Sequence, residues 1–353
     1  FYTWHNVVCI LRINIKESTM LILGIESSCD ETGLALYSEE EGLIAHMVNS
    51  QVELFTEYGG VIPEIAARDH SVKIINILKT LLKKADKKLN DINLVAYTAG
   101  PGLIGSLMIG ETVAKTISNV LDIELLPINH LEGHILAPGL EDDNLETPYL
   151  CLLVSGGHTQ IIECSDYGSY KILGETVDDA CGEAFDKVGK LLNLDYPGGP
   201  KVSKLAAGGD PARFNFPRAL MKDRNLNFSF SGLKTAVLYA LEDLEEKDYP
   251  DVAASFQEAV VDVLVKKLAY AIEQTGIKKL VCSGGVAANS LLRERLTDMG
   301  KTSKLEVSYP KMEFCTDNAA MIAYAGFIRK KYNLKEYPTK FARPRWPLGE
   351  LYD

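Results

Sequence analysis

Two histidines four residues apart, His130 and His134 in the sequence NHLEGH, have the types and spacing that best suit chemistry. In a helix, side chains at positions i and i+4 lie on one face, about 6 Å apart at their Cβ atoms. Two imidazoles so placed can bind one transition metal ion, and Asp317, in CTDNAA, is a candidate third ligand. The alternatives are two solvated helix histidines and an aspartate that caps the next helix.

Small, glycine-rich turns are a second chemical signal. Ser155, Gly156 and Gly157 follow an apolar run at 150–154, and a similar Ser-Gly-Gly turn at 283–285 follows a run at 280–282. Glycine lets the backbone approach a ligand closely, and backbone N–H groups suit phosphate oxygens. Asn289, expected on the helix after the second turn, could present its amide to a base or ribose, or be solvated.

Acidic residues occur at two further places. Asp30 and Glu31 lie in the polar turn between apolar runs at 21–25 and 33–37. Asp179, Glu183 and Asp186 are spaced by four and three residues, which predicts a helix face with three carboxylates. A solvated acidic face is the alternative for the second group.

An alternation of short strands and helices must position these residues, and it predicts an α/β fold. Paired apolar runs predict one β-hairpin at 21–37 and another at 150–162, each followed later by a strand, a glycine loop and a helix. Helical periodicity extends over 62–84, 103–119, 252–275 and 318–331. The matching order predicts duplicated halves, 20–148 and 149–353, with an insert at about 176–232. A ligand cleft between halves would resemble that of the actin, Hsp70 and sugar-kinase superfamily.

Composition limits the class of protein. The 353 residues are 46% hydrophobic with a net charge of −11, which is typical of a globular protein of about two domains. Seven scattered cysteines without a C-x-x-C pair favour neither a disulfide framework nor a thiolate zinc site, and no apolar run suits a membrane span. We expect a cytoplasmic location, and we expect residues 1–19 to be an extension upstream of a natural start at Met20.

Two basic tracts stand out against the acidic total. Residues 201–234 contain seven Lys or Arg and two Asp, interleaved with four phenylalanines, and residues 329–345 contain seven Lys or Arg and one Glu. Basic residues with aromatic neighbours suit single-stranded nucleic acid. Ordinary solvated charge is the alternative for each tract.

Taken together, the motifs resemble those of one family across residues 20–351. They include ILGIESSCDETG, NHLEGH, LLVSGGHTQ, GEAFDKVGKLLNLDYPGGP, SGGVAAN and FCTDNAAMIAYAG. These strings resemble the catalytic subunit of tRNA threonylcarbamoyladenosine synthesis, and RPRWPL at 343–348 resembles its bacterial branch. The resemblance implies the duplicated actin-like fold. It also implies transfer of a threonylcarbamoyl group from threonylcarbamoyl-AMP to the exocyclic amine of the adenosine beside the anticodon, in tRNAs reading codons that begin with A.

The resemblance also implies roles for residues. The metal ligands would be His130, His134 and Asp317, holding one divalent transition metal per chain, with iron ahead of zinc. Asp30 and Glu31 would orient the attacking amine or a metal-bound water. The substrate-binding residues would be Leu153, Val154, Ser155, Gly156, Gly157, Asp186, Gly199 and Asn289, while a further family position falls near Ser203. The implied partners are tRNA, an inactive paralogue and a small ATPase, with no membrane.

Three other functions remain as alternatives. An ATPase or sugar kinase would share the fold but would need no histidine pair. A metalloendopeptidase would need H-E-x-x-H, whereas Glu132 follows the first histidine by two residues. A non-catalytic nucleotide-binding scaffold would have no use for three metal ligands.

Overall fold

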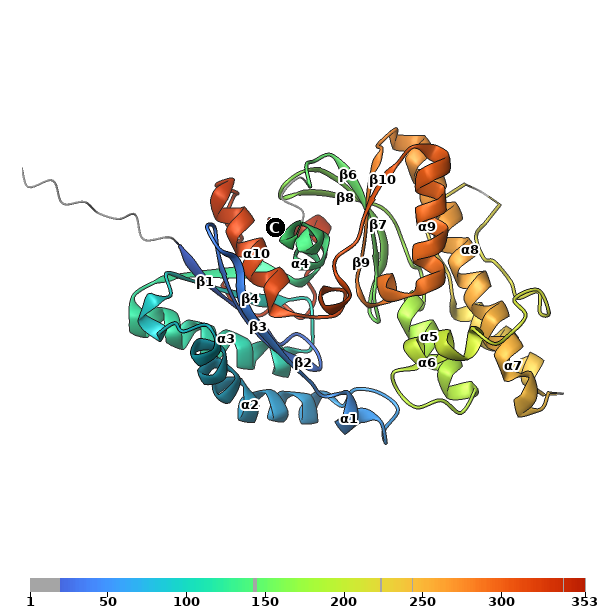
Figure 1. Ribbon diagram of the computed structural model, residues 1–353, viewed down its shortest axis with the longest axis horizontal. Coiled ribbons are helices and arrows are strands. Elements are labelled where there is room, and N and C mark those ends of the chain that lie inside the picture. The colour runs from blue at the N-terminus through green and yellow to red at the C-terminus, as the bar shows by residue number, and fades with distance from the viewer. Residues whose placement is uncertain (1–19, 142–144, 223, 243, 339, 353) are drawn as a thin grey trace, which may run out of the picture.

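Two five-stranded sheets form the framework of the computed structural model, which describes residues 20–141, 145–222, 224–242, 244–338 and 340–352 (Figure 1). The expectation about residues 1–19 lies outside these residues. The first sheet and its helices are built from β1 (Leu21–Glu26), β2 (Glu31–Ser38), β3 (Gly42–Ser50), α1 (Val52–Phe55), α2 (Pro63–Lys84), β4 (Leu94–Gly100), α3 (Ile104–Leu121), β5 (Glu124–Asn129) and α4 (His130–Leu136).

The second sheet begins with the next strand of the chain. Its elements are β6 (Tyr149–Val154), β7 (Thr159–Asp166), β8 (Ser169–Glu175), α5 (Cys181–Leu191), α6 (Gly198–Ala206), α7 (Ser231–Leu241), α8 (Tyr249–Thr275), β9 (Lys279–Ser283), α9 (Ser290–Ser303) and β10 (Glu306–Ser308). The last helix, α10 (Ala319–Lys331), follows β10.

Both sheets have the same topology. The orders are β3-β2-β1-β4-β5 and β8-β7-β6-β9-β10, with an antiparallel hairpin and meander on one side and two parallel strands on the other. The predicted hairpins and the duplicated α/β fold are therefore confirmed. In each half, the hairpin turn and the loop after the first parallel strand lie at the same edge of the sheet.

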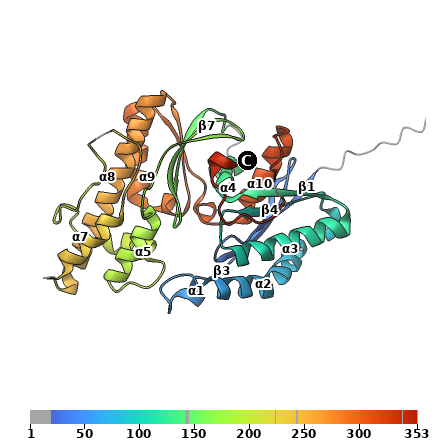
Figure 2. The same ribbon diagram turned by 180° about the vertical axis from the view of Figure 1, so that it is seen from behind.

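Helices cover both faces of the first sheet, which explains why β1 is apolar from Leu21 to Ile25. One face packs against α2 and α3, in a cluster that includes Leu23 and Leu78. The other packs against α10, in a cluster that includes Ile22 and Ile322. Figures 1 and 2 show α10 on the opposite side of this sheet from α2 and α3.

Helix α10 thus belongs to the range expected to form the second half but packs on the first sheet. The chain crosses from β10 of the second sheet to α10 through the segment that carries Asp317. This crossing places Asp317 between the two sheets. None of the helices in the described ranges combines the length and apolar character required to cross a membrane.

Candidate metal centre

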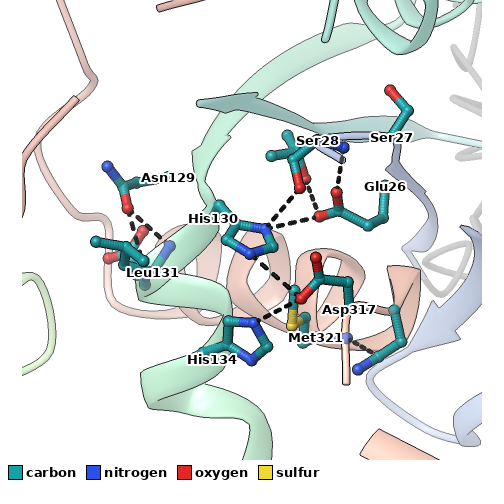
Figure 3. A network of polar contacts seen from close by, with 12 residues as sticks. Glu26, Ser27, Ser28, Asn129, His130, Leu131, His134, Asp317 and Met321 are labelled. Atoms are coloured by element: carbon teal, nitrogen blue, oxygen red, sulfur yellow. Dashed lines mark hydrogen bonds and ion pairs between the residues drawn. The ribbon is translucent and has the colours of Figure 1, made fainter. Parts of the chain in front are cut away.

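Three side chains from distant parts of the sequence converge on one point (Figure 3). The Nε2 atom of His134 lies 3.0 Å from Oδ1 of Asp317, and Nε2 of His130 lies 3.4 Å from the same oxygen. Their candidate ligand atoms all lie within 4.8 Å of one another. In the described part of the chain, no other three His, Cys, Asp or Glu side chains form such a group.

Helix α4 presents both imidazoles because it begins at the first of them. The Asn129 side-chain oxygen accepts hydrogen bonds from the backbone N–H groups of Leu131 (2.9 Å) and Glu132 (3.3 Å). This N-cap starts the helix at His130 and puts His134 one turn later on the same face. The two rings are 4.7 Å apart at their centroids.

Asp317 does not cap α10, so that alternative is wrong. The N-cap is Asn318, whose side-chain oxygen accepts from the backbone N–H of Met321 at 3.0 Å. Because the neighbouring asparagine satisfies the helix terminus, the Asp317 carboxylate is available to the histidines.

Glu26, which sequence analysis did not single out, holds the outer side of His130. Its Oε2 lies 3.1 Å from His130 Nδ1 and also accepts from Thr98 Oγ1 at 2.6 Å, while Oε1 accepts from the Ser28 N–H at 2.6 Å. A carboxylate that accepts a hydrogen bond from Nδ1–H leaves the Nε2 lone pair for a metal. Glu26 could have been recognised in the sequence by its position, because it ends a strand whose other residues are all apolar and buried.

The charges in this cluster shift the pKa values strongly. Although burial opposes the shift, the carboxylates of Asp317 and Glu26 raise the pKa of His130 well above its usual range. Against the effect of burial, His130 and His134 hold the pKa of Asp317 well below its usual range. The two carboxylates therefore favour positive charge at this centre, which a bound cation would supply.

The donor set fits a divalent transition metal. Two imidazole nitrogens and one carboxylate oxygen suit zinc or iron, and three protein ligands leave coordination positions for substrate or water. Metal-binding histidines usually donate a hydrogen bond to an outer carboxylate, and Glu26 is placed to accept such a bond from His130.

The turn after β6 lies beside the metal centre. The Ser155 N–H donates to His158 O at 2.8 Å, and the His158 N–H donates to Ser155 Oγ at 3.1 Å. Gly156 and Gly157 are exposed, with open space where a Cβ would be. Burial, followed by the charges of the metal-centre histidines, lowers the pKa of His158 to about 4, so its ring stays neutral at physiological pH.

Leu153 and Val154 end β6 and are wholly buried, so they support the turn that follows rather than exposing side chains to a ligand. The Val154 carbonyl lies against the second glycine turn, at Gly284. This residue has φ +93°, and a Cβ added there would lie 2.4 Å from Val154 O. The two glycine turns thus pack directly on each other.

Gly284→Ala is expected to lower the free energy of unfolding by about 2–3 kcal/mol, because alanine disfavours this φ and would meet the Val154 carbonyl. Gly285→Ala is the matched control, since its nearest atom, Thr316 Cγ2, is 3.9 Å away; we expect a change within about 1 kcal/mol. Urea denaturation measures both, and equal losses would contradict the close packing of the turns.

Asp30 and Glu31 lie at the corresponding turn of the first sheet. Burial, the neighbouring Asp30 and then Asp317 raise the pKa of Glu31 well above its usual range. His70 of α2 braces the turn: its Nε2 lies 3.0 Å from Cys29 O, and its Nδ1 lies 2.7 Å from Thr32 Oγ1. The acidic turn is therefore held rigidly and lies within electrostatic range of the metal centre.

Asp186 of α5 approaches the acidic turn from the other half. The Gly198 N–H donates to its Oδ1 at 2.8 Å, and the Gly199 N–H also contributes. Burial nevertheless raises the pKa of Asp186, and the Asp30 carboxylate adds to the rise. Residues of the two halves therefore face each other here.

The predicted three-carboxylate face of α5 is wrong. The helix begins at Cys181, so Asp179 lies outside it. Lys187 pairs with Asp179 at 2.6 Å and with Glu183 at 3.0 Å, and Asp186 binds the backbone instead. Asp179 and Glu183 are thus paired with a lysine, whereas Asp186 is held by backbone N–H groups. The three carboxylates therefore do not form one acidic face.

Asn289 is the N-cap of α9 rather than a residue within the helix as predicted. Its side-chain oxygen accepts from the Leu292 N–H at 3.0 Å. Its Nδ2 donates to Gln257 Oε1 at 2.8 Å and lies 3.4 Å from Ser203 Oγ. Asn289 and Ser203 are therefore neighbours.

The aromatic part of the first basic tract does not form a base-stacking surface, contrary to the interpretation above. Phe216, Phe228 and Phe230 are buried in the core of the second half. Tertiary packing therefore explains these phenylalanines.

The charges of both tracts are also partly paired. Arg213 contacts Asp248 (2.7 Å) and Asp251 (2.6 Å), Arg218 contacts Asp262 (2.8 Å), and Arg224 contacts Glu273 (3.0 Å). In the second tract, Arg329 is buried in an ion pair with Glu132. These acidic partners come from outside the two tracts, and they offset part of the tracts' positive charge.

Comparison with known protein families identifies one that matches this chain. The sequence model of the family TsaD, tRNA N6-adenosine threonylcarbamoyltransferase, matches residues 42–324. The matched range contains all the candidate metal ligands and both glycine turns.

Solved structures with low sequence identity share the fold. Full-length HypF in a phosphate- and nucleotide-bound form matches with 15% identity and a TM-score of 0.59 over 88% of this chain, which spans only 46% of HypF. Component A of (R)-2-hydroxyglutaryl-CoA dehydratase from Acidaminococcus fermentans matches with 15% identity and a TM-score of 0.53, over 90% of this chain and 100% of that protein. The chain therefore has the actin-like ATPase fold.

Proposed function

The chain belongs to the tRNA N6-adenosine threonylcarbamoyltransferase family and is a transferase of tRNA modification, and from this premise we propose its substrates and site. The donor is threonylcarbamoyl-AMP, and the acceptor is the exocyclic amine of the adenosine beside the anticodon in tRNAs reading codons that begin with A. AMP is the leaving group. The convergence of His130, His134 and Asp317 in a chain of this family carries the proposal.

One divalent transition metal ion, iron in preference to zinc, would be bound by His130, His134 and Asp317. A metal bound there supplies a Lewis acid that orients phosphate and polarises a carbonyl oxygen. Glu26 keeps the Nε2 lone pair of His130 directed at that position, because it accepts a hydrogen bond from the Nδ1–H.

The donor's phosphate and adenosine would lie along the glycine turns of the second half. Exposed Gly156 and Gly157 offer backbone N–H groups to phosphate oxygens, with Ser155 closing the turn and the buried Leu153 and Val154 holding it at the end of β6. Asp186, Gly199 and Asn289 complete the proposed substrate contacts from α5, α6 and the start of α9.

Glu31, beside Asp30, is our candidate for the group that accepts a proton from the attacking amine. The carbamoyl carbon gains the N6–C bond, the bond to AMP breaks, and the amine loses one proton. A carboxylate whose pKa is raised above its usual range is a better proton acceptor than an ordinary one. Asp30 would orient the amine.

Binding of tRNA by this chain would involve partner surfaces, since several basic side chains of the two tracts already have acidic partners. We propose an inactive paralogue and a small ATPase as those partners. An adenosine in the anticodon loop is already unpaired, so little energy is needed to expose it.

The metalloendopeptidase alternative cannot use Glu132 as its base. Glu132 is buried and bonded to Arg329, so its carboxylate is not available to a water at the metal. For a kinase, the histidine pair would have no role.

Incubating the complete complex with threonylcarbamoyl-AMP and unmodified tRNA tests the proposal. Nucleosides released by digestion should include threonylcarbamoyladenosine, with AMP formed in equal amount. If the complete complex forms no modified nucleoside and this chain alone releases ADP from added ATP, a kinase or ATPase would instead be supported.

A further inference from the structure

Glu132 lies in α4 between the two histidines and is completely buried together with its partner, Arg329 of α10. The Arg329 Nη1 atom lies 3.1 Å from one Glu132 carboxylate oxygen and 3.2 Å from the other, and the two side chains are 2% or less exposed. A buried charge of this kind requires its partners, because leaving it unpaired costs several kcal/mol. The pair therefore ties α4 to the helix that follows Asp317.

Two further elements donate to the same carboxylate. Tyr170 of β8, in the second sheet, donates to Glu132 Oε1 at 3.0 Å, and the hydroxyl of Tyr337 donates to Oε2. Arg329 also donates to the Lys335 carbonyl. The Glu132 carboxylate thus gathers donors from α10, β8 and the C-terminal segment, defined as residues 335–338 and 340–352.

The C-terminal segment also holds the start of α4. The Asn129 side chain, which caps this helix, donates from Nδ2 to the Trp346 carbonyl at 2.9 Å. The segment is itself bonded to β4, through Tyr97 to the Lys340 carbonyl at 2.9 Å and from the Arg343 N–H to Ala99 O at 2.6 Å. Both the beginning and the middle of α4 are therefore attached to one segment.

Helix α4 lies unusually close to α10 beside the candidate metal ligands. A Cβ at Gly133 would be 2.9 Å from Ile322 Cδ1 and 3.2 Å from Met321 Cγ. The separation of α4 from the start of α10 directly sets the distance from His134 to Asp317. A helix of seven residues has little stability of its own, so tertiary contacts decide where it lies.

We propose that Glu132 is a positioning residue for the metal centre: through Arg329, Tyr170 and Tyr337 it sets the spacing of the two imidazoles relative to Asp317. This inference rests on the proposed metal site. It assigns to Glu132, which binds no metal itself, a role in metal affinity and coordination geometry. The C-terminal segment, remote in sequence from NHLEGH, takes part through the same carboxylate.

The test measures metal binding rather than activity. Metal-free protein is titrated with Co²⁺, whose visible absorption reports coordination geometry, and with Zn²⁺ against a chromophoric chelator. Glu132→Gln keeps the shape of the side chain but removes its charge. We expect about tenfold weaker binding, at the lower end of what supporting residues of metal sites contribute, together with shifted Co²⁺ bands.

Glu124→Gln is the matched control. Glu124 is exposed and pairs at 2.9 Å with Lys330, the neighbour of Arg329 on α10, so it should bind metal as the wild type does. If Glu132→Gln does not fold, Tyr337→Phe carries the test, because it removes one donor and keeps the ion pair; about threefold weaker binding and shifted bands are expected.

The outcomes separate the inference from its premise. A wild-type protein that takes up neither metal overturns the metal site itself. Normal wild-type binding, with unchanged affinity and spectrum in the folded Glu132 or Tyr337 variant, overturns only the positioning role. If the metal-free variant melts at a lower temperature but binds metal as the wild type does, the positioning role is also overturned. The residue would then stabilise the fold without affecting the metal site.

Discussion

His134→Ala is expected to abolish stoichiometric metal binding, whereas the purified wild type should hold about one transition metal ion per chain. The His134 Nε2 atom lies 3.0 Å from Asp317 Oδ1 and is one of only three candidate ligand atoms in the group. Removing it should weaken binding by more than about 100-fold, beyond the loss typical of an outer-shell partner. Elemental analysis after extensive dialysis measures the metal content.

His46→Ala is the control for this change. His46 is partly exposed on β3 and contacts Glu313 at 3.1 Å, outside the candidate metal centre. Its variant should retain the wild-type metal content. Equal metal in wild type and His134→Ala would show that the ion binds elsewhere.

Glu31→Gln should reduce the rate of threonylcarbamoyl transfer by about 100-fold or more while leaving metal content unchanged, because glutamine cannot accept the proton of the attacking amine. Single-turnover formation of the modified nucleoside measures this rate. Glu57→Gln, which alters an exposed carboxylate just after α1, should transfer at the wild-type rate.

The pH dependence gives a second measure of the same role. The base must be ionised to act, and the pKa of Glu31 is raised by burial and by Asp30 and Asp317. The wild-type rate should therefore fall with decreasing pH through a pKa above the usual value of about 4.3 for glutamate. In Glu31→Gln that acidic limb should disappear. A variant that keeps both the rate and the limb would remove Glu31 from the mechanism.

Local patterns in the sequence determined the elements and the kind of chemistry. The apolar runs at 21–25 and 150–154 predicted the hairpins, because strands covered on both faces need apolar residues throughout. Helical periodicity over 62–84 placed α2 to within one residue. The i, i+4 histidines shared a face because Asn129 before them caps the helix.

Other interpretations failed because local patterns do not contain the partners. Phe228 and Phe230 alternate with polar residues in a basic tract, yet they fill the core of the second half. Arg213 and Arg218 lie in that tract, but their acidic partners come from residues 248–262. A stretch of basic and aromatic residues therefore forms an exposed binding surface only where no distant segment of the chain packs against it.

The assembly of the metal centre was decided by tertiary structure. Asp317 meets His134 because the chain crosses back from the second sheet to cover the first with α10, a path that no local pattern encodes. Glu26 reaches His130 across 104 residues, and Glu132 reaches Arg329 across 197. Residue types and spacing thus determined which side chains could bind a metal, whereas the close packing of buried charges between two sheets decided which of them meet and how they are held.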